Sequence, residues 1–420
     1  MCIRDSIGGD TGEVDGNPPP RPNKGFGILI SNNAMNTLVQ NSTLGINLSG
    51  GVKVSNVNKT YQEDEERQIT ATIDSNHIGY HWHLYDGWTR LAGTAGNGIH
   101  LDKSTDVFIT DNYIYAHEVG IYIGGEGSEH NQIDGGLVRK SSKQGLLIEN
   151  SKSDEISLAV YEAGSHGIQL SQTDSICFLP TLSRENQGAG FYLNKANWTV
   201  LQSLKLPNGG KQILESSRNN SYGLHINDSH DLIISLCEFT FNNDHGILVD
   251  GGSDKVEISA PYVSDNSGIG IYLLGSNNIQ IHPEKNDSLY VNSNTNSGIV
   301  VENAKNVKIG KLNQASNNIS GNGQQGILIK GEQTDDVDIV AVNYIGNNDA
   351  EGVRVDNGKN ICIGGQAKDE GNSIENNTIG VLAQGTNTQL SILNNNIGCL
   401  LYTSDAADEL DGVDLGGRRI

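Results

Sequence analysis

Gly98-Ile99-His100-Leu101 is the stretch that decides the fold, because its pattern returns along most of the chain. Each copy is a glycine, an apolar residue, a variable residue and a second apolar residue. The later copies begin at Gly120, Gly145, Gly167, Gly190, Gly223, Gly246, Gly270, Gly298, Gly326, Gly352 and Gly380. Subtracting successive glycine numbers gives 22, 25, 22, 23, 33, 23, 24, 28, 28, 26 and 28 residues. A period of this size predicts a solenoid of stacked coils.

The inside of each repeat favours short strands. A second alternating run follows the first, as in Val256-Glu257-Ile258 and Val307-Lys308-Ile309, and turns rich in Asn, Asp, Ser and Gly separate the runs. Alternation with period two indicates strands with one buried face. We expect equivalent strands to pair in parallel from coil to coil around a core of Ile, Leu and Val, with Asn side chains forming ladders at the turns. The recurring glycine suits a positive φ or a crowded corner.

The C-terminal third carries a more specific pattern, in Asn343-Tyr344-Ile345-Gly346, Ile363-Gly364-Gly365 and Gly371-Asn372-Ser373-Ile374. It resembles the repeats of right-handed parallel β-helix proteins of pectate-lyase-like fold, and the resemblance covers nearly all of residues 23–398. The resemblance implies an all-β, single-stranded right-handed parallel β-helix (solenoid) of about 12–14 coils. Polysaccharide lyases, hydrolases, epimerases, phage tailspikes and adhesins share this fold, so it does not choose among them.

The remaining segments are interpreted separately. Residues 1–6 and 399–420 lack the repeat and resemble translated sequencing-adapter DNA read in opposite senses, which would make the chain a gene fragment open at both ends. Residues 7–22 are a Pro-rich lead-in or linker. Residues 52–97 interrupt the pattern and are expected to form an irregular insertion in the β-helix of residues 23–398.

The charge of the chain limits its partners. With 50 acidic and 28 basic residues, the formal charge is −22. The two terminal segments hold six acidic and three basic residues, so residues 7–398 carry −19. Such a surface repels nucleic acid and anionic lipid, and also a polyanionic glycan unless Ca²⁺ or a basic cluster intervenes. No apolar run is long enough for a membrane span.

The candidate site lies on the outward positions of the repeat. The variable residue, and the residue two further on, point away from the core. Between the coils of Gly98 and Gly270 these positions form a band of aromatic, imidazole, carboxylate and amide groups, which suits flat sugar rings and their hydroxyls. The candidate ligand-binding residues are Tyr122, Gln169, Tyr192 and Tyr272, together with Trp82 and Trp88 of the insertion.

Four residues of the band are candidates for acid–base catalysis, namely His100, Glu149, His225 and Asp250. His225 and Asp250 fall on adjacent coils one outward step apart. By diagonal strand geometry we expect them about 7–8 Å apart, too far for a direct hydrogen bond. The alternative is that these are ordinary solvated strand residues.

Apolar residues also occupy outward positions, at Leu248, Leu274, Val300, Leu328 and Leu382. A row of exposed apolar side chains suggests a covering loop or a partner, of which a tailspike-like homotrimer is one version. Flanking domains are another possible partner.

Specific enzyme signatures are missing. Ser165-His166-Gly167 and Asp244-His245-Gly246 resemble the Gly-His-Gly of polygalacturonases. The paired aspartates expected one coil earlier are replaced by Ser221-Tyr222-Gly223, and the basic motif expected one coil later by Gly270-Ile271-Tyr272. The resemblance therefore carries over no catalytic residue.

The insertion contains His77, His81, His83 and Asp86, whose spacing allows a Zn²⁺ interpretation. An irregular loop can hold any spacing, so we expect no metal and no cofactor, with Ca²⁺ left open. Trp82 and Trp88 either pack as a lid or form a sugar-stacking patch.

Two functions remain open. The first is a secreted or cell-surface β-helix protein that binds polysaccharide or acts as a surface or adhesin module. The alternative is a polysaccharide-processing enzyme, namely a lyase, glycoside hydrolase or epimerase. Because the specific enzyme signatures fail, the first is favoured, with an extracellular or cell-surface location.

Overall fold

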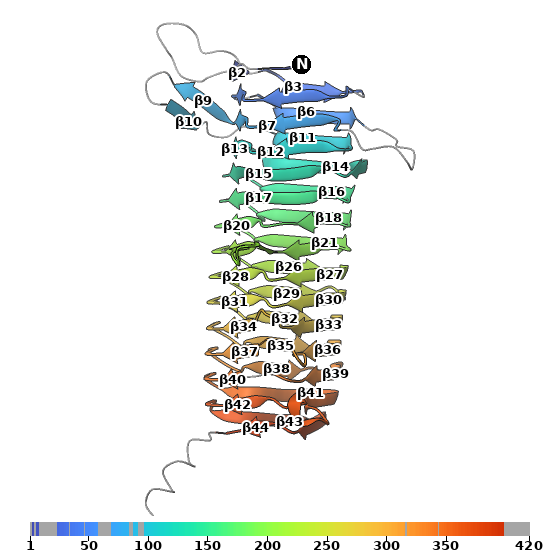
Figure 1. Ribbon diagram of the computed structural model, residues 1–420, viewed down its shortest axis with the longest axis vertical. Coiled ribbons are helices and arrows are strands. Elements are labelled where there is room, and N and C mark those ends of the chain that lie inside the picture. The colour runs from blue at the N-terminus through green and yellow to red at the C-terminus, as the bar shows by residue number, and fades with distance from the viewer. Residues whose placement is uncertain are drawn as a thin grey trace, which may run out of the picture.

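The computed structural model describes residues 23–398, except 33, 46, 58–68, 84–86, 91–95, 316 and 343, and also β1 (Cys2–Ile3) and β2 (Ser6–Ile7). Parallel strands stack into a solenoid of about 14 turns (Figure 1). Each turn, or coil, contributes one strand to each of three faces, here called A, B and C in chain order. The predicted fold class and coil number are thus confirmed.

Face A holds the strands that follow the recurring glycines, and it is the longest face. Its strands are β3 (Phe26–Ser31), β6 (Gly50–Val57), β11 (Asn97–Ser104), β14 (Val119–Glu129), β16 (Leu146–Lys152), β18 (Ile168–Asp174), β21 (Phe191–Asn197), β26 (Leu224–Asn227), β29 (Ile247–Asp250), β32 (Ile271–Leu274), β35 (Ile299–Glu302), β38 (Ile327–Lys330) and the first parts of β41 (Glu351–Gly364) and β43 (Ile379–Leu393).

Face B holds the second alternating run of each repeat. Its strands are β4 (Thr37–Gln40), β7 (Ala71–Asp74), β12 (Val107–Thr110), β19 (Cys177–Phe178), β22 (Val200–Gln202), β27 (His230–Ser235), β30 (Asp254–Ser259), β33 (Asn277–His282), β36 (Lys305–Ile309), β39 (Asp335–Ile339), the first parts of β15 (Gln132–Arg139) and β17 (Glu155–Tyr161), and the second parts of β41 and β43. β1 pairs with β4.

Face C closes each coil with a short strand. Its strands are β5 (Thr43–Leu44), β8 (His77–Ile78), β13 (Tyr113–Tyr115), the second parts of β15 and β17, β20 (Leu182–Arg184), β25 (Glu215–Ser217), β28 (Glu238–Thr240), β31 (Tyr262–Ser264), β34 (Leu289–Asn292), β37 (Asn317–Ser320), β40 (Tyr344–Gly346), β42 (Ser373–Glu375) and β44 (Asn396–Ile397). β2 pairs with β5, and a 3₁₀ turn, η1 (Lys368–Glu370), precedes β42.

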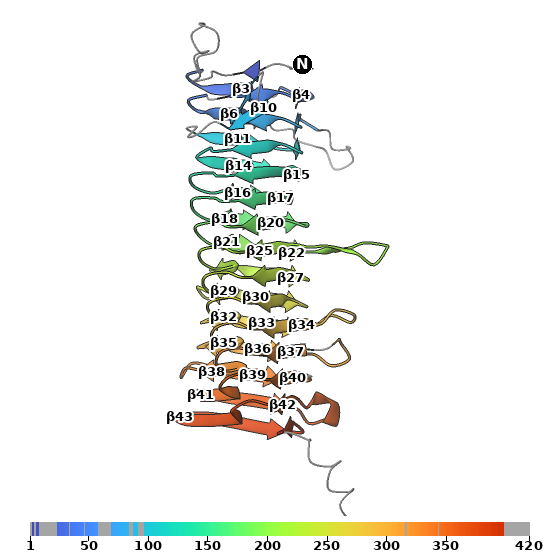
Figure 2. The same cartoon turned by 90° about the vertical axis from the view of Figure 1, so that its left-hand side faces the viewer.

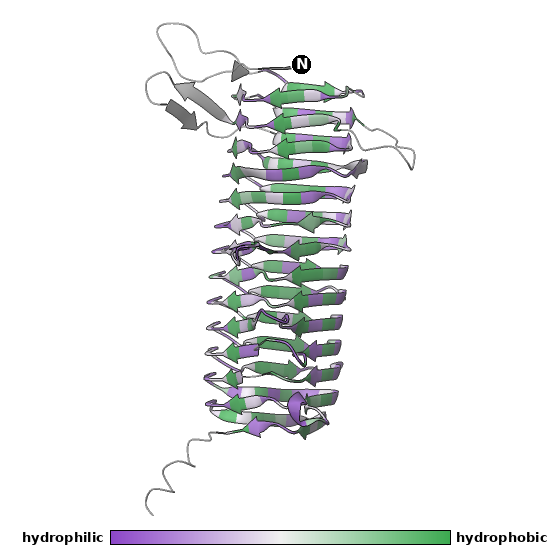
Figure 3. Ribbon diagram, in the orientation of Figure 1, coloured by the Kyte–Doolittle hydropathy of each residue, from purple (hydrophilic) through white to green (hydrophobic). Residues whose placement is uncertain are grey.

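The register places equivalent residues above one another. Ile121 pairs with Leu146, and Leu146 in turn pairs with Ile168. The inward residues of all three faces form one core of Ile, Leu and Val with a few Phe, and hydrophobic segments stack from coil to coil (Figure 3). No single coil could bury these residues alone, so stacking is what stabilises the fold.

The recurring glycine sits at a crowded corner between faces C and A. A Cβ on Gly246 would lie 2.4 Å from Val263 Cγ1 and 2.7 Å from the Gly270 carbonyl oxygen. Gly246 has no positive φ, and neither do the equivalent glycines. Steric room, and not backbone freedom, is therefore the reason for glycine here.

The expected asparagine ladder is present at the same corner. Each Asn side chain donates from Nδ2 to Oδ1 of the next, as from Asn219 to Asn242 at 2.9 Å. The unbroken series comprises Asn186, Asn219, Asn242, Asn266, Asn294, Asn322, Asn348 and Asn377. These bonds satisfy buried amides that would otherwise be costly.

Part of the stretch expected to be irregular is a regular coil. Residues 50–57, 71–74 and 77–78 form β6, β7 and β8, which pair with the coils before and after them. Outside this coil, β9 (Tyr80–His83) and β10 (Gly87–Arg90) form an antiparallel pair.

A second hairpin extends from the end of face B. β23 (Leu204–Lys205) and β24 (Lys211–Gln212) pair in antiparallel fashion, and the hairpin leaves the body beside β22 and β25 (Figure 2). Lys205 Nζ and Lys211 Nζ each lie 2.5 Å from an Asp287 carboxylate oxygen, and Lys205 also contacts Glu284 at 3.5 Å. The hairpin is thus attached to a loop several coils further along.

Candidate functional site

The outward side chains of face A form a continuous strip in the middle of the solenoid. Tyr192 on β21, His225 on β26, Leu248 on β29 and Tyr272 on β32 are successive partners in the parallel register. Side chains from the corner before each strand lie beside them. We call this set, together with His166, Tyr222 and His245, the aromatic strip.

The rings of the strip touch in sequence. The centroids of His166 and Tyr192 are 4.7 Å apart and nearly parallel, and Tyr192 is 5.1 Å from His225. The chain of contacts continues from His225 to Tyr222 at 5.0 Å, to His245 at 5.6 Å and to Tyr272 at 5.4 Å. Six rings from five coils thus form one half-buried surface.

His225 and Asp250 make a direct contact, which corrects the expectation from the sequence. His225 Nε2 lies 3.0 Å from Asp250 Oδ1. Diagonal geometry separates the backbones, but the imidazole is long enough to bridge the coils. Because the carboxylate accepts, the ring keeps its hydrogen on Nε2 and presents Nδ1 as an acceptor.

The backbone fixes His166 in the same tautomer, whereas His245 Nδ1 lies between a backbone N–H and the Asp244 carboxylate. His166 Nδ1 accepts from the Ala189 N–H, and His245 Nδ1 accepts from the Ile269 N–H, both at 3.0 Å. Burial, and then the neighbouring His225, lowers the pKa of His166. Burial also lowers the pKa of His245, although Asp244, 3.0 Å from Nδ1, opposes it. The neutral His166 ring therefore offers an Nε2–H donor.

The end of the strip at Tyr272 is strongly hydrogen-bonded. The Tyr272 hydroxyl donates to Glu302, which also pairs with Lys330 Nζ at 2.8 Å. Burial and this carboxylate raise the pKa of Tyr272. Burial works to raise the pKa of Glu302, but Lys330 and Tyr272 outweigh it and leave that pKa lowered. Tyr272 is therefore a fixed neutral platform.

The N-terminal candidates form a second, smaller group. The ring centroids of His100 and Tyr122 are 4.7 Å apart with the rings tilted by 54°, and burial, followed by Lys53, lowers the pKa of His100 to about 4. Burial and then Glu149 raise the pKa of Tyr122. Gln169 accepts from Gln144 at 2.7 Å. Leu147, paired with Tyr122 and Gln169, interrupts the row of rings between this group and the aromatic strip.

The outward apolar residues are not an exposed row, which corrects the second expectation. Leu248 is 5% exposed and Val300 is 1% exposed, while Leu274, Leu328 and Leu382 are half-buried. Leu248 lies between His225 and Tyr272, and Val300 between Tyr272 and Leu328. Because neighbouring side chains already flank these apolar residues, the apolar residues give no reason to invoke a covering partner.

Three functional candidates were missed from the sequence. His166, Tyr222 and His245 each stand immediately before a recurring glycine, at the corner adjoining the outward column. That shared position was the available signal. Trp82 and Trp88 are directly opposite in the β9–β10 ladder, but their side chains, and those of His81, His83 and Asp86, lie outside the described part of the chain.

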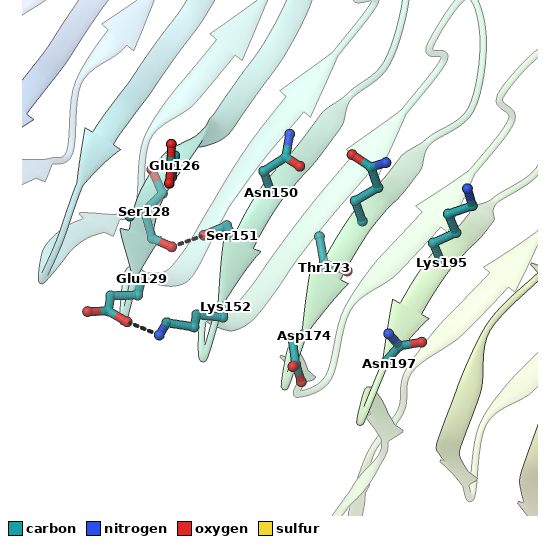
Figure 4. A pocket seen from close by; sticks show the side chains of 12 residues that line it. Glu126, Ser128, Glu129, Asn150, Ser151, Lys152, Thr173, Asp174, Lys195 and Asn197 are labelled. Atoms are coloured by element: carbon teal, nitrogen blue, oxygen red, sulfur yellow. Dashed lines mark hydrogen bonds and ion pairs between the residues drawn. The ribbon is translucent and has the colours of Figure 1, made fainter.

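A separate hollow of about 830 Å³ lies at the corner between faces A and B (Figure 4). Its lining mixes signs, and Lys152 Nζ pairs with Glu129 at 3.0 Å. Below it, burial raises the pKa of Asp154 to about 6, against hydrogen bonds from Ser151 and Asn131. Self-paired charges and hydroxyls leave this hollow without a distinct chemical preference.

Two family models match the chain. The model described as periplasmic copper-binding protein (NosD) matches residues 36–202 and 73–255, and so covers residues 36–255. The model described as right handed beta helix region matches residues 214–334. A comparison with curated proteins found no match.

The first model's description names copper, which would need several metal-ligating side chains close together. Within the described residues, no three or more His, Cys, Asp or Glu side chains gather to hold a metal. The Cys237 thiol donates to the Ser235 and Leu201 carbonyls, and burial raises its pKa. The described side chains therefore do not fit a copper centre.

Several solved structures share the chain path at low identity. The A-module of Azotobacter vinelandii mannuronan C-5 epimerase AlgE4 is 11% identical, with TM-score 0.45, over 84% of this chain and 90% of that one. A double mutant of the periplasmic alginate epimerase AlgG is 14% identical, with TM-score 0.49, over 82% and 76%. Bacteriophage CBA120 tailspike protein 2 is 13% identical, with TM-score 0.34, over 85% of this chain and 48% of that one.

Their TM-scores all lie below 0.5, so these likenesses carry no conclusion about this chain. Together with the parallel three-faced coils, the two family models account for most of the described chain. In the same described part, no helix is long and apolar enough to cross a membrane. The NosD model matches more than half of the chain, so the chain belongs to the NosD family, and its fold is a right-handed β-helix.

Proposed function

We propose that the protein binds polysaccharide along the aromatic strip of face A. The observation that carries this proposal is the run of six touching rings from His166 to Tyr272. Such rings offer flat apolar faces to sugar C–H groups, and their edges carry polar groups for hydroxyls. Coils repeat at about 4.8 Å, so a strip of five coils suits an extended chain and not a single small molecule.

The charge of the strip favours a neutral glycan. Asp244, Asp250 and Glu302 border it, while the two imidazoles whose pKa is lowered, His166 and His245, add no positive charge near neutral pH. A polyuronate would meet carboxylates on the strip and a formal charge of −22 on the whole chain.

The test is glycan-array binding with wild type and a Tyr192→Ala, His225→Ala double variant. Both side chains are half-buried and point outward, so the variant should keep nearly the same melting temperature. Loss of binding by the variant would support the proposal.

The matched control is Tyr290→Ala. Tyr290 on face C is 39% exposed and contacts Tyr262 at 6.0 Å, so it resembles a strip residue in chemistry but lies on another face. Full binding by the Tyr192→Ala, His225→Ala variant would contradict the proposal, as would equal loss in the control.

A second candidate function is supported by one contact. Asp250 accepts the hydrogen bond from His225 Nε2, which leaves His225 Nδ1 free to act as a general base. The His225 ring lies at the centre of the strip, between Tyr192 and Tyr222. This geometry suits proton abstraction from a uronic sugar, as in a lyase or epimerase, so this candidate requires an acidic glycan and not the neutral one favoured above. Lyase and epimerase assays on neutral and uronic polysaccharides, with Asp250→Ala as the variant, test it; unchanged turnover in that variant would exclude this base.

The solenoid also suits a surface or adhesin module. About 14 coils at roughly 4.8 Å give a rigid rod about 60 Å long. The word periplasmic in the matching model's description supports a location outside the cytoplasm. Fractionation of cells expressing the full gene tests that location.

A further inference from the structure

Trp198 occupies an unusual backbone position at the start of face B. It has φ of 52°, in the left-handed region that Asn, Asp and Gly tolerate best. The equivalent position also has positive φ in most other coils, Thr70 and Gln389 being the exceptions, and in the first coil it is Asn36. In the remaining coils it is occupied by Asp106, His130, Ser153, Ser175, Asp231, Lys255, Asn278, Asn306, Asp336 and Asn360.

Trp198 is thus the one apolar residue in a column of polar residues. Its side chain is 57% exposed, and its ring meets His230 only edge-on at 6.5 Å. Strained φ costs on the order of 1–2 kcal/mol, and the exposed ring recovers little by burial. The fold therefore gains little from tryptophan here, and a strained, exposed aromatic residue suggests a binding role.

A groove of about 540 Å³ lies beside this ring on face B. Ile233, Glu257 and Gln280 are successive outward residues along its length, and Ile233 is 43% exposed. This volume is within the range of small-ligand sites. Unlike the aromatic strip, the groove has a single aromatic ring at one end, with the exposed Ile233 beside it and polar side chains further along.

The polar side chains of the groove nearly balance in charge. Lys255 Nζ lies 3.5 Å from Asp231 Oδ1, and Glu257 lies 2.9 Å from His282 Nε2. The remaining lining is amide, from Asn278, Gln280 and Asn306. Amides and paired charges donate and accept hydrogen bonds without selecting a charged ligand.

Beyond the groove, two strands of face B contact the loop that holds the hairpin. Ser235 and Ser259, two residues beyond Ile233 and Glu257, donate to Glu284 at 2.6 and 3.1 Å. An exposed indole beside amides and paired charges suits the face of a sugar ring and its hydroxyls.

We propose that this groove on face B is a carbohydrate subsite for a neutral oligosaccharide, with the Trp198 ring as its stacking platform. It does not depend on the aromatic strip, which lies on face A. One sugar ring stacks on the indole, and the next units run from coil to coil along Ile233, Glu257 and Gln280.

The test uses Trp198→Asn and a panel of cellohexaose, laminarihexaose, maltohexaose and xylohexaose at millimolar concentration. Tryptophan fluorescence and calorimetry report binding. We expect at least one hexaose to bind wild type and to bind the variant about tenfold more weakly or worse. We expect the variant's melting temperature to be equal or higher, because Asn tolerates this φ.

Phe241→Asn is the matched control. Phe241 is also exposed with positive φ, at 52% and 56°, but it lies at another corner with Arg218 over its ring at 5.8 Å. Hexaose binding should survive in this control and in the Tyr192→Ala, His225→Ala variant, whose expected defect is in the binding of long polysaccharides to face A. Three outcomes would overturn the subsite: no hexaose binds wild type, Trp198→Asn binds as wild type does, or Trp198→Asn melts several degrees lower.

Discussion

His225 Nε2 and Asp250 Oδ1 lie 3.0 Å apart, although the backbone pairs His225 with Leu248 and not with Asp250. The contact crosses from one outward column to the other on the next coil. It fixes the orientation of the ring at the centre of the aromatic strip. Both side chains are largely shielded, at 18% and 23% exposure, so the bond is worth more than a surface pair.

Asp250→Ala should release the His225 ring. We expect long-range ¹H–¹⁵N NMR to show the Nε2–H tautomer of His225 in wild type and a tautomer mixture in the variant. The free energy of unfolding should fall by only about 0.5–1.5 kcal/mol. Asp356→Ala is the control, because Asp356 occupies the same column but pairs with Arg354 at 2.9 Å. An unchanged His225 spectrum in Asp250→Ala would show that the carboxylate does not set the tautomer.

Two histidines should make stability fall on acidification. Burial lowers the pKa of both His100 and His117 to about 4, from an ordinary value of 6.5. Between these values the unfolded chain binds more protons than the folded one. The free energy of unfolding therefore falls as the pH falls from 6.5 to 4. Urea unfolding across this range should show a smaller loss in His100→Gln than in wild type; parallel curves would refute the assignment.

Asp154→Asn should stabilise the protein at neutral pH. Burial raises the pKa of Asp154 to about 6, above its ordinary 3.8. The folded state therefore binds the extra proton, and this residue's contribution to stability is lost as pH rises from 3.8 through 6. Asn keeps the oxygen that accepts from the Asn131 N–H at 2.8 Å. We expect a gain of about 1–3 kcal/mol at pH 8 and almost none at pH 4. An equal gain at both pH values would contradict the burial of an ionisable carboxyl.

Gly246→Ala should destabilise the stack because there is no room for a methyl group. The added Cβ would lie 2.4 Å from Val263 Cγ1. Overpacking of this kind costs about 1–3 kcal/mol. Gly25→Ala is the control, since a Cβ there meets nothing within 4 Å and the φ of Gly25 is not positive. Equal melting temperatures for the two variants would show that the corner is not crowded.

The fold could be predicted from the sequence because one glycine pattern encodes it locally. Gly98-Ile99-His100-Leu101 and its copies specify the corner, the inward pair and the outward residue of every coil. Stacking requires only that these units repeat, so no long-range information was needed. The regular coil of β6, β7 and β8 was overlooked because only part of residues 50–78 shows the pattern.

The sequence predicted which outward residues lie above one another, but not which of their side chains touch. Tyr192, His225 and Tyr272 followed from the alternation, and the structure places all three in one strip. The bond from His225 to Asp250 depends on how far a side chain reaches, which backbone spacing does not give. His166, Tyr222 and His245 precede the glycine, where the chain turns, so alternation could not assign their direction.

The lysine contacts of the β23–β24 hairpin have a consequence for mechanical unfolding. In a solenoid each coil normally contacts only the next, so coils can detach one by one from an end. Lys205 and Lys211 instead join Asp287, three coils away, so we expect residues 200–290 to unfold together. Pulled from its ends at low salt, the rod should lengthen in small steps interrupted by one larger rupture.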